Sequence, residues 1–248
     1  MIKPEVLFKA LSDLGIDFFS GVPDSLLKDF CAFVTDNVIK SQHVITANEG
    51  NALALSAGHY LGTGKVGLVY MQNSGLGNVI NPLLSLNDPE VYGLPVLLMI
   101  GWRGEPGLKD EPQHIKQGRI STTLLDAMEI PWHIIDSNTK DIKNIINLAL
   151  NQALNREGPV AFMVRKGTFS HYSLKAIQEI NNQISREQAI QQLVKQLNSN
   201  DRIVATTGMP SRELYEFRES RGDNLGNDFF TVGSMGHAAS ISLGLAIS

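Results

Sequence analysis

Short runs of apolar residues recur along the first two thirds of the chain, and the segments between them carry apolar residues at helical spacing. Several runs, such as VAFMV at 160–164, contain no polar residue, which is typical of a strand with both faces buried. Such strands occur in parallel sheets that helices cover on both sides. The alternation therefore predicts an α/β fold built on a doubly wound, mostly parallel sheet. Its strands are expected at 16–22, 43–47, 66–71, 95–101, 131–135 and 160–164.

A polar stretch after residue 168 interrupts this alternation, and a helix followed by a strand begins again near residue 185. We therefore expect a first domain over residues 1–170, a linker over 171–185 and a second unit over 186–248. The second unit is too short to close a sheet like the first. The final helix ends without a cap or a polar tail, so we interpret the sequence as a fragment of a longer protein.

The composition of the 248 residues excludes several classes of protein. The chain has 21 Lys and Arg against 25 Asp and Glu, a net charge of -4, which argues against nucleic acid as a partner. A single cysteine, Cys31, allows no internal disulfide and is typical of a reducing compartment. No apolar run approaches the ~18 residues of a membrane span, and the N-terminal helix carries acidic residues, unlike a signal peptide. A cytoplasmic location is expected.

Two segments at predicted strand ends allow two interpretations each. In the turn at 21–25, Asp24 or Ser25 could cap the next helix, or the loop could bind an anionic ligand at the end of its strand. Thr46 and Glu49 have the spacing of a capping box. The helix after Glu49 is small or apolar on all sides, however, so its start is expected in the interior or at an interface. A carboxyl group there could hold a proton to share.

The turn Asn-Ser-Gly-Leu-Gly-Asn at 73–78 follows a predicted strand but lacks the third glycine of a dinucleotide-binding fingerprint, so NAD binding is disfavoured. The six histidines are scattered singly, and no arrangement has metal-ligand spacing. The segment at 101–114 is a long loop with three glycines, two prolines and charges of both signs, which favours function. Arg103 and Lys109 there could bind an anion, and Glu111 and His114 could transfer a proton.

Taken in order, these segments resemble the thiamin-diphosphate-dependent decarboxylases. The stretches GVPDSLLK, ANEGNALALSAGHYL, GWRGEPGLKDEPQH, TTGMPSREL and VGSMGHA are similar to the branch of that family acting on phosphonopyruvate, a near relative of the sulfopyruvate branch. The resemblance covers nearly the whole chain. It implies a pyrimidine-binding domain over residues 1–170 and the N-terminal part of a diphosphate-binding domain over 186–248.

The resemblance also implies roles for individual residues. Glu49 matches the glutamate that activates the aminopyrimidine of the cofactor, and His114 lies where relatives keep proton-relay groups. Met235 matches a bulky side chain that supports the bent cofactor. The residues expected to bind thiamin diphosphate are Pro23, Glu49, Thr207, Gly208, Met209, Gly233, Ser234 and Met235. The residues expected to bind the substrate are Asp24, Ser25, Arg103 and Lys109.

The family holds Mg²⁺ and the diphosphate through a Gly-Asp-Gly motif, which this sequence does not contain. We expect the motif after Ser248 and no metal ligand within these residues. The resemblance implies active sites shared between subunits, hence a homodimer or higher homo-oligomer, and a small anionic 2-oxo acid as substrate. The reaction expected is decarboxylation of 3-phosphonopyruvate to phosphonoacetaldehyde. The alternatives are a sulfopyruvate decarboxylase, a subunit or fragment inactive without further residues, and, more distantly, an NAD-dependent oxidoreductase.

Overall fold

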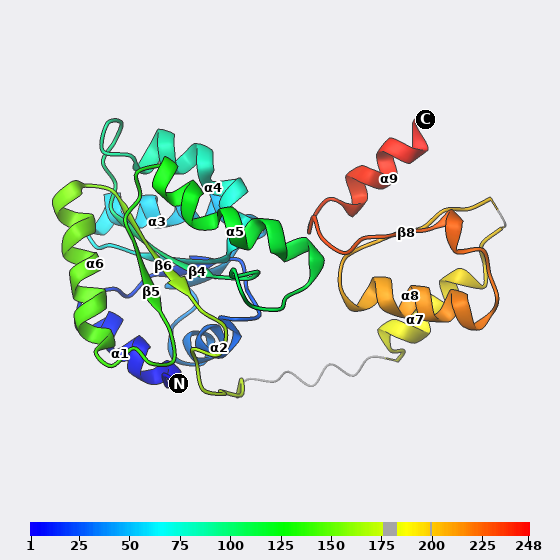
Figure 1. Ribbon diagram of the computed structural model, residues 1–248, viewed down its shortest axis with the longest axis horizontal. Coiled ribbons are helices and arrows are strands. Elements are labelled where there is room, and N and C mark those ends of the chain that lie inside the picture. Colours follow the sequence, from blue (N-terminus) through cyan, green and yellow to red (C-terminus); the bar gives the residue numbers. More distant parts are fainter. Residues whose placement is uncertain (176–182, 199) are drawn as a thin grey trace. The chain divides into compact units, whose positions relative to one another are not determined.

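The computed structural model describes residues 1–175, 183–198 and 200–248. The chain divides into two units, Met1–Ile177 and Gln178–Ser248 (Figure 1), and each is described by itself. The predicted linker, 171–185, includes residues 176–182, which lie outside the described residues. No helix in the described part of the chain is long and apolar enough to cross a membrane.

The first unit is built on a six-stranded sheet in the order β2-β1-β3-β4-β6-β5. Every neighbouring pair is parallel, so the predicted α/β class and the parallel sheet are confirmed. All six predicted strands are present, although most are shorter than the apolar runs that predicted them. They are β1 (Phe19–Gly21), β2 (His43–Ile45), β3 (Leu68–Gln72), β4 (Val96–Gly101), β5 (Trp132–Ile135) and β6 (Pro159–Val164).

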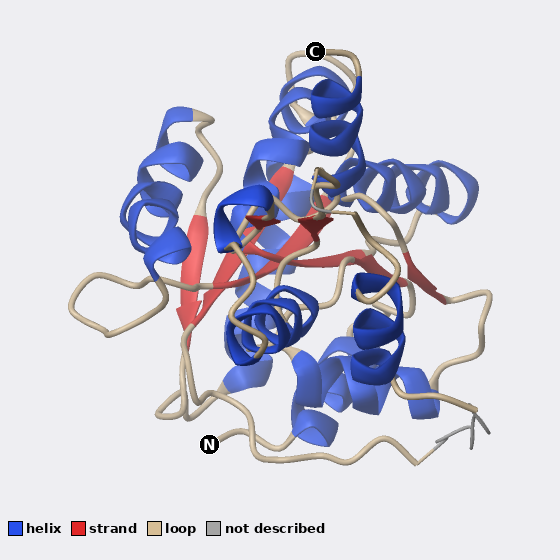
Figure 2. Ribbon diagram, turned by 90° about the vertical axis from the view of Figure 1, so that its right-hand side faces the viewer, coloured by secondary structure: helices blue, strands red, loops and turns tan. Residues whose placement is uncertain are grey.

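Alternate residues of the strands enter two separate hydrophobic cores, one on each face of the sheet. In β4, Leu97 and Met99 join one core, whereas Leu98 and Ile100 join the other. In Figure 2 the strands run between helices on either side. The first face is covered by α1 (Pro4–Asp13), α2 (Lys28–Asn37) and α6 (Ile142–Arg156), and the second by α3 (Glu49–Thr63), α4 (Leu76–Pro82) and α5 (Pro112–Ala127).

Because all six strands are parallel, their carboxyl ends meet at one edge of the sheet, where open α/β sheets bind ligands. The segments leaving β1, β2, β3 and β4 all begin at this edge. A 3-10 turn, Asn73–Gly75, joins β3 to α4. The longest of these segments runs from the end of β4 to the start of α5 at Pro112.

The second unit is small. Its helices are α7 (Arg186–Val194), α8 (Met209–Ser220) and α9 (Ala238–Ala246), with a short turn at Leu225–Asn227. Two short parallel strands, β7 (Val204–Ala205) and β8 (Phe229–Phe230), pair beside them. At the start of α7, Ser185 and Gln188 form a reciprocal capping box. The buried apolar core among the described residues consists of Val194, Ala205 and Leu214.

Candidate active site

Glu49 is the first residue of α3, and its side chain takes no part in capping that helix. The cap is Asn48, whose side-chain oxygen accepts a hydrogen bond from the Gly50 N–H at 2.8 Å. Thr46 instead donates to the Asn48 carbonyl at 2.9 Å. The predicted capping box of Thr46 and Glu49 is therefore wrong, because an asparagine is an equally good cap and lies closer to the free N–H groups.

The Glu49 carboxyl group is buried, with the residue only 6% exposed, yet one of its oxygens is open. Oε2 accepts a hydrogen bond from the Asn78 Nδ2 on α4 at 2.7 Å, whereas Oε1 makes none with any described residue. The side chain lies directly against Gly75, where an added Cβ would come within 2.6 Å of Oε1. Only glycine leaves this space, so the turn after β3 is shaped around the carboxyl group.

Asp24 lies in the segment after β1 and is more buried than Glu49, with 4% exposure. Its Oδ2 accepts from the Leu26 N–H at 2.5 Å, while Oδ1 is enclosed without a hydrogen bond in the part of the chain that the structure describes. Burial raises the pKa of Asp24, against the opposing effects of the Leu26 N–H, the Gln72 side chain and the nearby Arg103 charge. A raised pKa favours the neutral carboxyl group, which can donate a hydrogen bond.

The capping interpretation of the turn at 21–25 is also wrong. The helix α2 begins at Lys28, and its cap position is Leu27, which makes no side-chain cap. The Asp24 side chain is used one turn earlier, where it accepts the Leu26 N–H, and its carbonyl accepts the Leu27 N–H at 3.2 Å. The Asp24 acceptors are used within this turn and do not cap α2. Asp24 and Ser25 therefore stay next to the end of β1.

Arg103, expected to bind an anion, already donates three side-chain hydrogen bonds to two groups, the Asp110 carboxylate and the Ser25 hydroxyl. Its Nε donates to Asp110 Oδ2 at 2.8 Å, its Nη2 to Asp110 Oδ1 at 2.5 Å, and its Nη1 to Ser25 Oγ at 2.9 Å. Its backbone exchanges two hydrogen bonds with the Asn73 amide. Lys109 is exposed and makes no ion pair or hydrogen bond with the described residues. The two cations therefore differ, since Arg103 is positioned and partly neutralised and Lys109 is free.

Asp110 organises this segment, although no sequence pattern singled it out. Besides Arg103, it accepts the Gly104 and Glu111 N–H groups, each at 2.8 Å. The Arg103 guanidinium holds the pKa of Asp110 well below its ordinary value, and the two N–H groups add to the effect. The only sequence signal for the pair is a carboxylate close to Arg103 in the chain. Glu105 and Glu111 carry the same signal, so the sequence does not single out Asp110.

His114 lies in the first turn of α5 and not in the loop where we expected it, because Pro112 begins the helix with Glu111 at the cap position. Its Nδ1 is enclosed without a hydrogen bond among the residues described. Burial lowers the pKa of His114, and the Arg103 charge acts in the same direction. The imidazole is therefore neutral at pH 7 and able to accept a proton.

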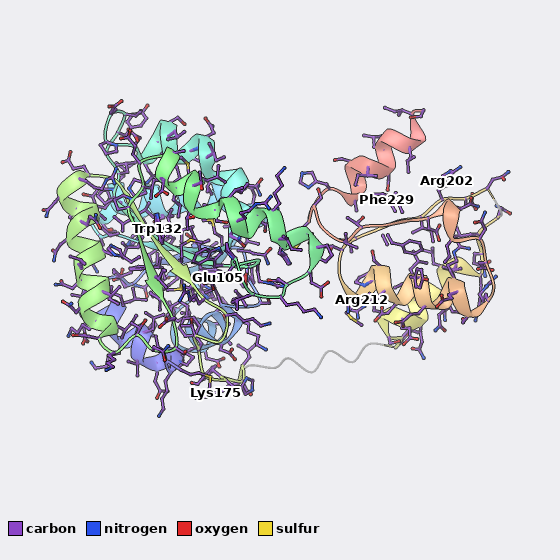
Figure 3. The ribbon with its side chains drawn as sticks, viewed as in Figure 1. Glu105, Trp132, Lys175, Arg202, Arg212 and Phe229 are labelled. Atoms are coloured by element: carbon purple, nitrogen blue, oxygen red, sulfur yellow. The ribbon has the colours of Figure 1, made fainter. Side chains whose placement is uncertain are left out.

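A second ion pair, which no sequence pattern indicated, joins the same loop to the end of β6. Glu105, labelled near β4 in Figure 3, is 9% exposed, and its Oε1 lies 2.8 Å from the Arg165 Nε. Its other oxygen, Oε2, is enclosed without a hydrogen bond in the described residues. The pair anchors the loop after β4 next to the strand ends that carry the predicted site residues.

The remaining predicted residues lie in two turns of the second unit. Thr207 and Gly208 follow β7, and Met209 begins α8, with Gly208 at a φ of +91° that favours glycine. The turn at 233–236 follows β8. The hydroxyl of Thr207 donates to the Val232 carbonyl at 2.8 Å, which brings the two turns together. The side chains of Met209 and Met235 are about half exposed, at 51% and 53%.

Comparison with known proteins shows the family of the chain. The family described as thiamine pyrophosphate enzyme, N-terminal TPP binding domain, matches residues 4–129. The chain therefore belongs to the thiamine pyrophosphate enzymes, and the resemblance seen in the sequence is confirmed.

Particular relatives narrow this class. The chain is 34% identical over 262 residues to phosphonopyruvate decarboxylase of Streptomyces viridochromogenes, which covers 100% of this chain and 64% of that protein. It is 36% identical over 164 residues to sulfopyruvate decarboxylase subunit alpha of Methanococcus maripaludis, covering 66% of this chain and 95% of that subunit. It is also 40% identical over 65 residues to sulfopyruvate decarboxylase subunit beta of Methanothermobacter thermautotrophicus, covering 26% of this chain and 32% of that subunit. The chain thus spans less than two thirds of the length of the first relative.

The residues present fit the pyrimidine end of thiamin diphosphate. An aminopyrimidine offers a ring nitrogen that accepts a proton, and Glu49 offers a buried carboxyl group with one oxygen bound and the other open. The described residues contain no group of three or more His, Cys, Asp or Glu that could hold a metal ion.

Proposed function

We propose that the full-length protein decarboxylates 3-phosphonopyruvate to phosphonoacetaldehyde and CO₂ with thiamin diphosphate and Mg²⁺. The observation that carries the proposal is the buried Glu49 carboxyl group with an open oxygen, in a chain that is similar over its whole length to a phosphonopyruvate decarboxylase. When bound, thiamin diphosphate supplies the electron sink for the pair of electrons released as CO₂ leaves. The protein supplies binding, orientation and proton transfer.

Glu49 holds the proton that is exchanged with the aminopyrimidine ring nitrogen, at its open oxygen. Pro23 lies next to the buried Asp24, on the strand-end segment proposed to face the cofactor. The second-unit turns are proposed to bind the rest of the cofactor: Thr207, Gly208 and Met209 its diphosphate, and Gly233, Ser234 and Met235 its pyrimidine side. The ligands of Mg²⁺ are proposed to lie outside these 248 residues.

The substrate carries about three negative charges, so it requires local cations on a chain with a net charge of -4. Arg103 keeps two N–H groups beyond those given to Asp110 and Ser25, and Lys109 is free to move toward the anion. Burial raises the pKa of Asp24, which makes protonation of this carboxyl group beside an anionic substrate less costly. His114, neutral at pH 7, can accept or relay a proton.

Sulfopyruvate decarboxylation is the second candidate function. The chain is similar to both the alpha and the beta subunit of sulfopyruvate decarboxylases, and a sulfonate differs from a phosphonate mainly in charge. The same similarity to two separate subunits supports a homodimer or higher homo-oligomer with shared sites. The third candidate is a chain that is inactive without further residues. A cytoplasmic location is proposed from the composition alone.

Titration of the full-length protein with thiamin diphosphate and Mg²⁺, followed by CO₂ release from phosphonopyruvate and sulfopyruvate side by side, tests the proposal. We expect faster turnover of phosphonopyruvate. Glu49→Gln should lower kcat by about 1000-fold, because it removes the exchangeable proton, while the affinity for thiamin diphosphate changes little. Near-normal turnover by this variant refutes the role of Glu49, and preference for sulfopyruvate refutes the proposed substrate.

Arg103→Ala tests the anion site separately. We expect the KM for phosphonopyruvate to rise by about 30-fold or more, because a charged hydrogen-bonding partner is lost, with a smaller effect on kcat. Arg103→Lys keeps the charge but not the forked geometry, so its KM should be intermediate. An unchanged KM in the alanine variant would assign the substrate anion to other residues.

A further inference from the structure

Asn78, a residue without a part in the proposed function, donates a hydrogen bond to the carboxyl group of Glu49. It lies in the third position of α4, and its side-chain Nδ2 is 2.7 Å from Glu49 Oε2. This distance is at the short end of the range for an N–H···O hydrogen bond. No other hydrogen bond to the Glu49 side chain is made by the described residues.

The chemistry of an amide determines what this bond can do. The NH₂ group of asparagine only donates, so the oxygen that it contacts must act as an acceptor. The unprotonated oxygen of a carboxylic acid is the stronger acceptor, so this bond favours Oε2 without a proton and places a proton of the carboxyl group on Oε1. Oε1 is the open oxygen, the one available to an aminopyrimidine nitrogen.

The surrounding backbone keeps this arrangement in place. The Gly75 backbone lies against the carboxyl group on the Oε1 side. The start of α3 is packed closely on α4, since an added Cβ at Gly50 would lie 3.0 Å from the Asn78 carbonyl oxygen. The donor and the carboxyl group thus sit on two helices in direct contact, and a rotation of the carboxyl group would break the Asn78 bond.

We propose that Asn78 is a positioning residue that orients the Glu49 carboxyl group and keeps its exchangeable proton on Oε1. The inference rests on the proposed use of thiamin diphosphate but not on the identity of the keto acid. A purely structural role, in which the bond only ties α4 to α3, predicts a loss of stability without any effect on the state of the cofactor.

Asn78→Asp is the sharpest test, because it keeps the shape and replaces the donor with an acceptor. Two adjacent carboxyl groups share a proton, which draws it from Oε1 to Oε2. Asn78→Ala removes the donor without adding a charge. The matched control is Asn81→Asp, which adds the same charge one turn later on α4, at an exposed residue whose side chain accepts from Ser85.

The variants are compared in the full-length protein loaded with thiamin diphosphate and Mg²⁺. Circular dichroism without substrate reports the amino or imino form of the bound aminopyrimidine, and the pH profile of this signal is recorded together with the cofactor Kd and kcat. For Asn78→Asp we expect loss of the imino signal at neutral pH and a kcat about 100-fold lower, with a Kd within about threefold. Asn78→Ala should lower kcat about tenfold and displace the pH profile.

An imino signal and a kcat for Asn78→Asp within twofold of those of Asn81→Asp would overturn the inference. So would a loss of stability in Asn78→Ala with an unchanged imino signal and pH profile, which is the result for a structural role. If the wild-type protein shows the imino signal but decarboxylates neither keto acid, the proposed substrate fails while the signal still tests Asn78. If the wild-type protein does not bind thiamin diphosphate, both fail.

Discussion

Three carboxyl groups at the same edge of the sheet have three different environments. Glu49 is buried with one open oxygen, Asp24 is buried with its pKa raised, and Asp110 is paired with Arg103 with its pKa lowered. The burial, hydrogen bonds and pKa of each carboxyl group follow from the residues that neighbouring segments place around it. The proposed roles differ accordingly, as proton exchange, donation to the substrate and positioning of a cation.

Asp110→Asn tests the ion pair through the pH dependence of stability. Because the folded pKa of Asp110 is lowered, its stabilisation is present above the unfolded value of 3.8 and is lost as the pH falls below it. We expect the variant to be less stable by about 2 kcal/mol at pH 7, since hydrogen bonds to a charged group are lost. The difference from the wild type should shrink progressively below about pH 4, as measured by urea unfolding.

Glu111→Gln is the control for this experiment, because it removes a charge at the next residue, which makes no ion pair among the described residues. Its unfolding free energy should follow the wild type across the same pH range. Parallel pH curves for the Asp110 variant and the wild type would show that the ion pair contributes little in solution.

At the scale of elements, the segment from β4 to α5 is held tightly by the helix that follows it. The Trp102 Nε1 donates to the Gly118 carbonyl at 2.9 Å. This hydrogen bond fixes the start of the segment against α5. Gly104 has a φ of +67°, and its carbonyl oxygen would lie 1.8 Å from a Cβ added at Gly118. The long loop expected from sequence is therefore a packed connection, which can present Arg103 in one orientation.

Gly118→Ala should destabilise the first unit by about 3 kcal/mol, because the new methyl group overlaps the backbone of a neighbouring segment that cannot move away freely. It should also raise the KM for phosphonopyruvate through displacement of Arg103. Gly58→Ala, at a helical position of α3 with nothing within 4 Å of the added Cβ, should stabilise by about 0.5–1 kcal/mol. Equal unfolding free energies for the two variants would contradict the packed connection.

At the scale of the whole molecule, the two units differ in how much apolar core they enclose. The first unit has an extensive core on each face of its sheet. The second encloses the small Val194, Ala205 and Leu214 cluster, while Leu243 and Ile247 at its end are 62% and 77% exposed. Stability scales with buried apolar area, so the two units should not be equally stable on their own.

Expression of residues 1–175 and of residues 183–248 as separate chains tests this difference. The first should unfold in one cooperative transition, with a free energy of unfolding of about 5 kcal/mol or more. The second should show no cooperative transition by circular dichroism in urea, because its core is too small to offset the conformational entropy of its chain. A sharp transition in the second fragment would refute this account.

The strands were predictable because each lies in a short apolar run of consecutive residues, and the central strands β4 and β6 are buried on both faces. The placement of Asp24 and Glu49 at strand ends was predictable for the same reason. The helix starts were less so, since Asn48 and Leu27 occupy the cap positions where Thr46 and either Asp24 or Ser25 were expected. Local patterns offered several caps of similar strength, and the packed chain selected one.

The sequence by itself determined the α/β class, the order of the strands along the chain and the membership in the thiamine pyrophosphate enzymes. Tertiary structure alone decided which groups meet at the strand ends. Asn78 reaches Glu49 across 29 positions, and Arg103 reaches Ser25 across 78. Periodicity reports only which face of an element is buried, whereas hydrogen bonds, ion pairs and pKa shifts depend on which segments the sheet brings to one edge.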